Sequence, residues 1–445
     1  MKRTHLKQSL LALGALTSAA CISSGQAQSS DALLNKLVDK GILTKDEAKG
    51  LKAETEKDFS KAYAAKSGMP DWVTSLKIGG DLRLRYEGIY SDSGDIADRG
   101  RFRYRLRPSI VATLKDNFEV GLRLTSSEAA SGSSNGGDPI SGNTSLSDNA
   151  SKKFLYIDMA YGKWTALNSA DWTLALTAGK MENPLHFPGT DVFDKDYTPE
   201  GFAQELTWRV NKNHSLKLTG AQFVLDEIDV SGKDPAMLGA QLRWTAAWTP
   251  KISTVLGGSY LSIINRDSLT TANVPNQGRG NSRTTGGALE HGFDPVIGEL
   301  SATYLFDKVP LYTGAFPVTV SGDYIYNHSA PDENTGYGFG FTLGKSGKKK
   351  TWQIDYRYTY LAGDAWYEEF TESDFGAFYG SPAPSGGSSG YRSGTNVKGH
   401  WLKAGYSPNN ALTLSVAYFF TDLVDGTPNS DSGAGRLQVD AVLKF

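Results

Sequence analysis

The sequence predicts an all-β fold, a transmembrane antiparallel β-barrel of about 16 strands with a short N-terminal helical segment. Three observations lead to this prediction. Apolar and polar residues alternate with a period of two along most of the chain after residue 70. Short and long connections alternate between these runs. No apolar run after residue 30 is long enough for a membrane-spanning helix, which excludes a helical membrane protein.

The alternation is clearest in residues 76–125. Leu82, Leu84 and Tyr86 share one register, whereas the other register is strongly charged. In a soluble sheet the charged face would meet water and the apolar face a core. In a membrane barrel the apolar face meets lipid and the charged face lines a wet interior. The charged register consists of Asp81, Arg83, Arg85, Glu87, Arg101, Arg103, Arg105, Arg107, Glu119 and Arg123.

The N-terminus has the pattern of an export signal. Lys2, Arg3 and Lys7 precede an apolar run, and the small residues around Ala27 resemble a cleavage site. We therefore expect residues 1–27 to be a signal peptide. Cys21 leaves lipidation as an alternative, although the Leu of a lipoprotein signal is missing. If Cys21 is removed with the signal, the mature chain has no cysteine and contains no disulfide.

Residues 28–70 are predicted to be a periplasmic helical segment and linker, followed by the barrel at 71–445. Ser30 can cap a first helix that Gly41 ends. Thr44 and Glu47 have the spacing of a capping box that opens a second helix. The segment is either a small helical hairpin or spacer, or an oligomerising or cell-wall-facing element.

The alternating runs predict sixteen strands, and the connections between them indicate how they are arranged. The strands are expected at 75–89, 99–114, 118–126, 152–163, 171–181, 201–210, 214–225, 237–248, 252–264, 295–306, 316–326, 336–345, 350–361, 397–406, 411–421 and 435–445. Several connections, such as 115–117 and 211–213, have tight-turn compositions. The long ones are 127–151, 182–200, 265–294 and 362–396. Because short and long connections alternate, the long ones fall at one end, which is typical of a bacterial outer-membrane barrel with periplasmic termini.

Several motifs resemble the bacterial putative-porin family of outer-membrane barrels with a short N-terminal helical segment. They are residues 34–48, 80–86, 98–107, 179–184 and 198–201, together with the C-terminal Phe445. The resemblance implies a passive or lightly selective pore in the bacterial outer membrane, without a cofactor. It implies contact with outer-membrane lipid, small hydrophilic solutes and the barrel-assembly machinery, and a homotrimer by analogy with other porins. It identifies no solute.

The charged register predicts where selectivity would arise. The seven arginines lie on three successive strands and would form one basic wall, partly offset by Asp81, Glu87 and Glu119. The connection 182–200 carries Asp191, Asp194 and Asp196. If this connection folds inward, its acids would face the wall and create a transverse field. Alternatively, the charges satisfy one another in a static ladder away from the narrowest point.

We predict no enzymatic, cofactor or metal site. The six histidines lack metal-ligand spacing. His214-Ser215 and His328-Ser329 are expected at opposite ends of the barrel, beyond the reach that a nucleophile and its base require. The net charge of −2 gives no general attraction to nucleic acid. Two alternatives to a pore remain: a barrel that anchors the cell wall or displays surface loops, and an outer-membrane hydrolase.

Overall fold

The computed structural model describes residues 37–38, 44, 47–51, 68–92, 97–130, 136–229, 232–276, 278–377, 394–426 and 431–445. The chain divides into two compact units. One comprises residues up to 78 together with 111–116, and the other comprises residues 79–110 and 117–445. The second unit contains the candidate site.

Within the described residues, sixteen long strands and one two-residue strand make up the sheet. The long strands are β1 (Val73–Ser91), β2 (Arg99–Leu114), β3 (Phe118–Ser126), β5 (Leu155–Asn168), β6 (Trp172–Lys180), β7 (Glu200–Arg209), β8 (His214–Val224), β9 (Ala236–Ala247), β10 (Ile252–Ile264), β11 (Pro295–Phe306), β12 (Phe316–Asn327), β13 (Thr335–Gly344), β14 (Thr351–Leu361), β15 (Val397–Ser407), β16 (Leu412–Leu423) and β17 (Ala434–Lys444). Short 3-10 turns lie at Lys115–Asn117, Asp148–Ala150 and Arg266–Ser268.

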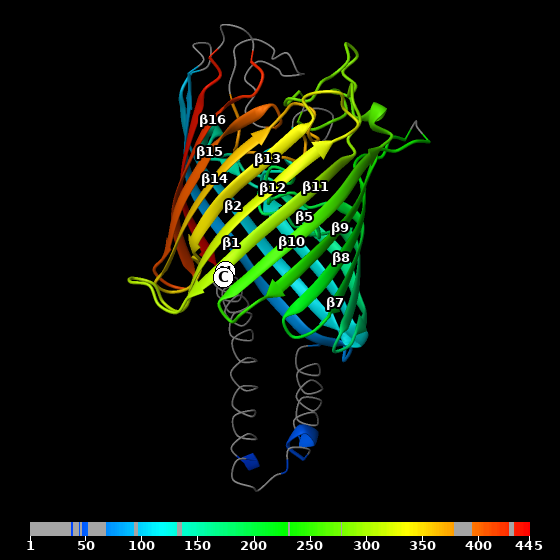
Figure 1. Cartoon of the computed structure of the whole chain (residues 1–445), viewed down its shortest axis with the longest axis vertical. Helices are drawn as coiled ribbons and strands as arrows, with labels where there is room; N and C mark the ends of the chain where they lie inside the picture. The colour runs from blue at the N-terminus through cyan, green and yellow to red at the C-terminus, as the bar shows by residue number, and fades with distance from the viewer. Residues whose placement is uncertain are drawn as a thin grey trace, which may run out of the picture. The chain divides into compact units, whose positions relative to one another are not determined.

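The sheet closes on itself as an antiparallel barrel (Figure 1). From β5 onward each strand pairs with the next one along the chain, and β3 pairs with β5. The seam joins the last strand to the first, because β17 pairs with β1 from Asp81 opposite Lys444 to Ser91 opposite Ala434. A closed barrel leaves no unpaired strand edge, as a bilayer requires.

All sixteen predicted strands are confirmed, with end shifts of a few residues. The sequence analysis missed β4 (Thr144–Ser145), which lies in the connection 127–151 and pairs with Arg103 and Tyr104 of β2. Its surroundings are rich in Gly, Ser and Asn, so no alternation reveals it. This short pairing holds the connection against the wall of the barrel.

The barrel is apolar on the outside and charged on the inside. Phe102 is 62% exposed, and Leu84 and Val120 are also exposed. Arg103 and Arg105, in the opposite register, are buried. Exposed apolar side chains at alternate positions of most wall strands are typical of a lipid-facing surface, and the charged register faces the interior. The apolar register therefore faces outward and the charged register faces inward, as the alternation predicted.

We expect Leu414→Arg to lower the free energy of unfolding of the barrel, because its side chain lies on the outward, lipid-facing register, where an arginine costs up to about 2 to 4 kcal/mol depending on depth. Leu414 is 45% exposed and lies on β16. The neighbouring Ser415→Arg should cost much less, because Ser415 lines an interior cavity. Urea titration of the two variants in lipid vesicles measures the difference, and equal losses would contradict the face assignment.

The predicted N-terminal capping box is confirmed. Thr44 Oγ1 accepts a hydrogen bond from the Glu47 backbone N–H at 3.2 Å, and Glu47 Oε2 accepts one from the Thr44 N–H at 2.8 Å. Residues 47–51 are helical. The predicted signal peptide, Ser30 and most of the first predicted helix lie outside the described residues. In the part of the chain that the structure covers, no helix has the length and apolar character needed to cross a membrane.

Three of the long connections pack together through apolar residues. Val192 and Phe193 of loop 181–199, Phe293 of loop 265–294, and Trp366 and Phe370 of loop 362–377 belong to one buried cluster. This cluster also includes inward-facing residues of the strands, among them Phe223, Leu261, Ile297, Ile325 and Leu361. The connections therefore carry an apolar core of their own, which fixes the acidic residues of loop 181–199 in place.

Candidate functional site

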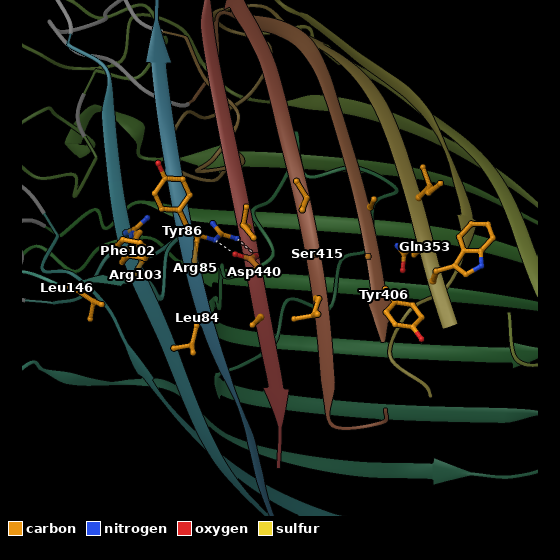
Figure 2. A pocket seen from close by; sticks show the side chains of 18 residues that line it. Leu84, Arg85, Tyr86, Phe102, Arg103, Leu146, Gln353, Tyr406, Ser415 and Asp440 are labelled. Atoms are coloured by element: carbon orange, nitrogen blue, oxygen red, sulfur yellow. Dashed lines mark hydrogen bonds and ion pairs between the residues drawn. The ribbon is translucent and has the colours of Figure 1, made fainter. Parts of the chain in front are cut away.

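Arg85 forms an ion pair across the seam of the barrel. It stands opposite Asp440 in the register of β1 and β17. Arg85 Nε and Nη2 donate to the two Asp440 carboxylate oxygens at 2.8 and 2.9 Å, a bidentate arrangement (Figure 2). Arg85 Nη1 also donates to Asp374 of loop 362–377 at 3.0 Å. One arginine thus joins two wall strands and a long loop.

The outer wall beside this seam has an apolar hollow of about 810 Å³ (Figure 2). Outward apolar residues of β1, β2 and β14–β17 form most of its lining, including Leu84, Phe102 and Tyr406, and the inward Arg85, Arg103 and Asp440 lie at its base (Figure 2). Its apolar lining differs sharply from the charged interior on the other side of the same strands. The wall therefore separates two environments within the thickness of one sheet.

Glu87 is the centre of a buried charge cluster. Its side chain is 0% exposed, and its carboxylate accepts a hydrogen bond from Arg101 Nε at 2.6 Å. Arg103 and Arg85 lie at 3.7 and 3.9 Å from Glu87 Oε2. Three guanidinium groups would repel one another here without the carboxylate. Glu87 therefore holds this part of the basic wall together.

A second cluster connects the wall to loop 181–199. Asp196 Oδ1 accepts from Arg105 Nη1 at 2.6 Å and from Arg107 Nη1 at 3.2 Å. The same two arginines contact Asp81 at 3.1 and 2.8 Å. Burial raises the pKa of Asp196, but Arg105, Arg83 and Arg107 outweigh it and hold that pKa well below its usual range. Asp196 is therefore ionised and faces the basic wall.

The other two acids of loop 181–199 have different partners. Asp191 Oδ1 accepts from Arg357 Nη2 of β14 at 2.9 Å, and Arg357 also contacts Asp323 of β12. Asp194 accepts the backbone N–H groups of Asp196 and Ser373 at 2.7 and 2.8 Å. Burial, then the charges of Glu372 and Asp196, raise the pKa of Asp194 well above its usual range. Asp194 therefore fixes loop conformation and contributes less negative charge than an ordinary Asp.

The remaining predicted residues lie further along the wall. Arg123 of β3 pairs with Asp158 of β5. Glu119 accepts a hydrogen bond from the Tyr161 hydroxyl at 2.9 Å. Arg83 donates to Asn143 Oδ1 at 2.6 Å. The structure therefore divides the thirteen predicted residues among several small networks rather than one continuous ladder.

Two interior cavities meet at Arg107 and Asp196. One has a volume of about 400 Å³ and is lined by Arg83, Arg85, Arg105 and Arg107 on one side and by residues of loops 181–199 and 362–377 on the other. The second has about 530 Å³ and is lined by Asp138, Asp226 and Glu227, among others. Both have Arg107 and Asp196 in their lining. This ion pair therefore stands between a basic and an acidic compartment.

Sequence reasoning missed several charged residues of this interior. Arg357, Asp323, Asp374, Arg436 and Asp440 all take part in the ion pairs. All but Asp374 occupy the inward register of late strands, so the alternation alone could have found them. Gly338 is also informative, because a Cβ there would collide with the Arg357 guanidinium. Gly338 stands opposite Thr359, two residues from Arg357 on β14, and its missing side chain gives that guanidinium room to reach Asp191.

The histidine and serine side chains that were considered for a hydrolase contact other groups. His214 stacks on Trp244 beside the turn before β8, and His328 stacks on Tyr260 beyond the end of β12. Ser329 Oγ donates to Asp294 at 2.7 Å rather than to a histidine. Within the described ranges, no group of three or more His, Cys, Asp or Glu side chains could hold a metal ion.

Comparisons with known proteins agree with the motifs in the sequence. Residues 90–265 match the family model described as "Putative porin". The resemblance inferred from the motifs is therefore confirmed over this part of the chain. A search of curated proteins gave no match.

Solved porin structures are similar in chain trace. OprB from Pseudomonas putida has 10% identity and a TM-score of 0.49, over 86% of this chain and 96% of that chain. A loop-deleted OmpT from Vibrio cholerae has 12% identity and a TM-score of 0.44, over 83% and 99%. A mutant porin from Rhodopseudomonas blastica has 12% identity and a TM-score of 0.42, over 83% and 100%.

Proposed function

Because residues 90–265 match the porin family model, we propose that this protein is a passive channel in the bacterial outer membrane. The observation that carries the proposal is the inverted barrel, with Leu84 and Phe102 exposed on the outside and Arg85, Glu87 and Arg105 buried inside. A charged, hydrated interior allows small hydrophilic solutes or ions to cross down their gradients without a cofactor or energy input. An enzyme would instead require a converging set of catalytic groups.

Selectivity would come from charges on the inner surface. The proposed determinants are the arginine register and the acids near it: Arg83, Arg85, Arg101, Arg103, Arg105, Arg107, Arg123, Asp81, Glu87, Glu119, Asp191, Asp194 and Asp196. The contact of Asp196 with Arg105 and Arg107 supports a field across the lumen at that level. The buried Glu87 cluster supports the alternative static role for Arg101 and Arg103.

Single-channel recording in planar bilayers tests this proposal. A stable open conductance is the expected result. A folded barrel that never conducts would contradict it and favour an anchoring or surface-display role. Release of fatty acid from the bilayer lipid would instead indicate the hydrolase.

The proposed channel function also implies which molecules surround and assemble the barrel. Outer-membrane lipid would surround the exposed register, and the barrel-assembly machinery would recognise the C-terminal strand that ends in Phe445. A homotrimer is the proposed assembly, and chemical cross-linking of the protein in native membranes tests it. The N-terminal segment would lie in the periplasm.

Deletion of residues 30–66 should leave the barrel folded, since the described barrel strands all lie after residue 72. The shortened protein should still migrate faster on gels before heating than after. Envelope attachment or oligomerisation is expected to weaken. Loss of the fast-migrating form would contradict the boundary between the N-terminal segment and the barrel.

A further inference from the structure

The cavity of about 400 Å³ has more positive than negative charge. Eight cationic side chains and six carboxylates line it. Burial raises the pKa of two of the six carboxylates, Asp194 and Glu372. The charge of the cavity is therefore more positive than the residue count alone indicates, which favours an anion.

Most of the arginines that line this cavity are already neutralised. Arg85 binds Asp440 and Asp374, Arg105 and Arg107 share Asp196, and Arg357 binds Asp191. A solute would have to break these ion pairs in order to use their charge. The cations available to a solute are therefore those without such a partner.

The unpaired cations among the described lining residues are Arg83, Lys195, Lys403 and Lys444. None of the described carboxylates lies within 4.0 Å of any of the four, and all four line the cavity. Lys403 stands opposite Asp355 in the register, but the Asp355 carboxylate accepts from Gln353 and Thr342.

Arg83 also has a hydrogen-bond donor that is not used within the described part of the chain. Its Nη2 donates to the neutral side chain of Asn143, and its buried Nε has no partner in the described part of the chain. Arg83 therefore keeps both its full charge and an unused hydrogen-bond donor.

An aromatic surface lies beside these cations. Trp401 of β15 and Phe419 of β16 are register partners that stack with ring centroids 6.1 Å apart. Phe375 of loop 362–377 packs edge-on against Phe419 at 6.5 Å. All three rings line the cavity, and Lys195 Nζ lies 5.6 Å from the centre of the Trp401 ring. The cavity thus combines uncompensated positive charge with an apolar planar wall.

We propose that this cavity binds small organic anions that carry one carboxylate and one planar apolar body. The carboxylate would bind between Lys195, Lys403 and Arg83, and the planar body would lie on Trp401 and Phe419. The indole Nε1 of Trp401 is buried without a hydrogen-bond partner among the described residues, so it offers a further donor. The volume is within the range typical of small-molecule sites. The role of these anions as solutes of the channel rests on the function proposed above, but their binding to the cavity can be measured separately.

Isothermal titration of the detergent-purified, folded barrel with benzoate tests the proposal. Lys195→Gln and Lys403→Gln should each weaken benzoate binding by roughly tenfold, the effect of losing one charged hydrogen bond. Lys251→Gln is the control, because Lys251 lies in an exposed turn, pairs with Asp307 and is not part of the cavity lining. This control should bind benzoate like the parent protein. Gel migration before and after heating shows that each variant has folded.

Two further ligands separate the contributions of charge and ring. Trp401→Leu should weaken benzoate binding more than acetate binding, because both anions can accept from the indole N–H but only benzoate has a ring to stack. Inorganic phosphate should bind more weakly than benzoate. Phosphate binding as tight as that of benzoate would overturn the role of the aromatic wall. Absence of benzoate binding, or binding unaffected by both lysine variants, would overturn the site.

Conductance distinguishes failure of this site from failure of the channel. In planar bilayers, millimolar benzoate should reduce the potassium chloride current of the parent protein more than that of Lys403→Gln. A conducting barrel that benzoate neither binds nor blocks would refute the site but leave the channel intact. A barrel that binds benzoate without conducting would refute the channel alone.

Discussion

Glu87→Gln is expected to lower the free energy of unfolding of the barrel by about 3 to 5 kcal/mol, the cost of removing one partner from a buried ion pair. Glu87 is fully buried and contacts Arg101, Arg103 and Arg85. A neutral amide would leave Arg101 without a carboxylate partner and would remove one of the acids that offset Arg85 and Arg103. The measurement is a urea titration of the protein in lipid vesicles, in which tryptophan fluorescence reports unfolding.

Glu200→Gln is the control for this variant. Glu200 accepts from Lys180 Nζ at 3.0 Å, but its side chain is 64% exposed. Exposed ion pairs contribute less than about 1 kcal/mol. Equal destabilisation by the two substitutions would show that the Glu87 cluster is hydrated and does not hold the wall together.

Glu368→Gln is expected to open the contact between loops 265–294 and 362–377, at a cost of about 3 to 5 kcal/mol. The Glu368 carboxylate accepts from Arg283 Nε and Nη2 at 3.0 and 2.6 Å. It also accepts the backbone N–H groups of Arg279 and Asn281 at 2.5 and 2.9 Å. An amide can replace only one of the two acceptor oxygens, so at least one donor would be left facing an NH₂ group.

Trypsin digestion measures this opening, because both Arg279 and Arg283 are potential cleavage sites. Cleavage should become roughly a hundredfold to several thousandfold faster, since proteolysis follows the population of the open state. Glu290→Gln is the control, because Glu290 lies exposed on the same loop and has no ion pair among the described residues. The barrel itself should stay folded in both variants. Equal cleavage rates would contradict the role of Glu368 as the link between the loops.

The fold could be predicted almost completely from the sequence. The alternation of Leu82 and Leu84 with Arg83 and Arg85 determines which face each strand buries, and a one-residue slip would reverse every side chain. The tight-turn compositions mark the strand ends. Among the described residues, the one strand that was not predicted, Thr144–Ser145, is too short to show a period.

The candidate site was predictable only in part. Residues of the inward register can be assigned to the interior from sequence, but their ion-pair partners depend on strand stagger and loop conformation. Asp194 and Asp196 have the same side chain and lie two positions apart. Yet Asp196 meets Arg105 and Arg107, whereas Asp194 accepts backbone N–H groups. No pattern in the sequence distinguishes them.

The packing of the loops was the largest omission. From the sequence, residues 265–294 and 362–396 are predicted mainly as long connections rich in small polar residues. Trp366, Tyr367 and Phe370 within them are almost fully buried. Large aromatic residues clustered in a long connection are a signal of packing, since they bury more apolar area than any other side chain.

The central claim is that the charged inner register lines the path of the solute, and reversal potential in a potassium chloride gradient tests it most directly. Arg105→Gln combined with Arg107→Gln should shift the channel toward cation preference, because both guanidinium groups line the cavity. Asp196→Asn should shift it toward anion preference, since it removes the ionised acid that faces them. Lys251→Gln, in an exposed turn, should cause no shift. Opposite shifts in the first two variants are the predicted result, and reversal potentials unchanged in both would contradict the claim.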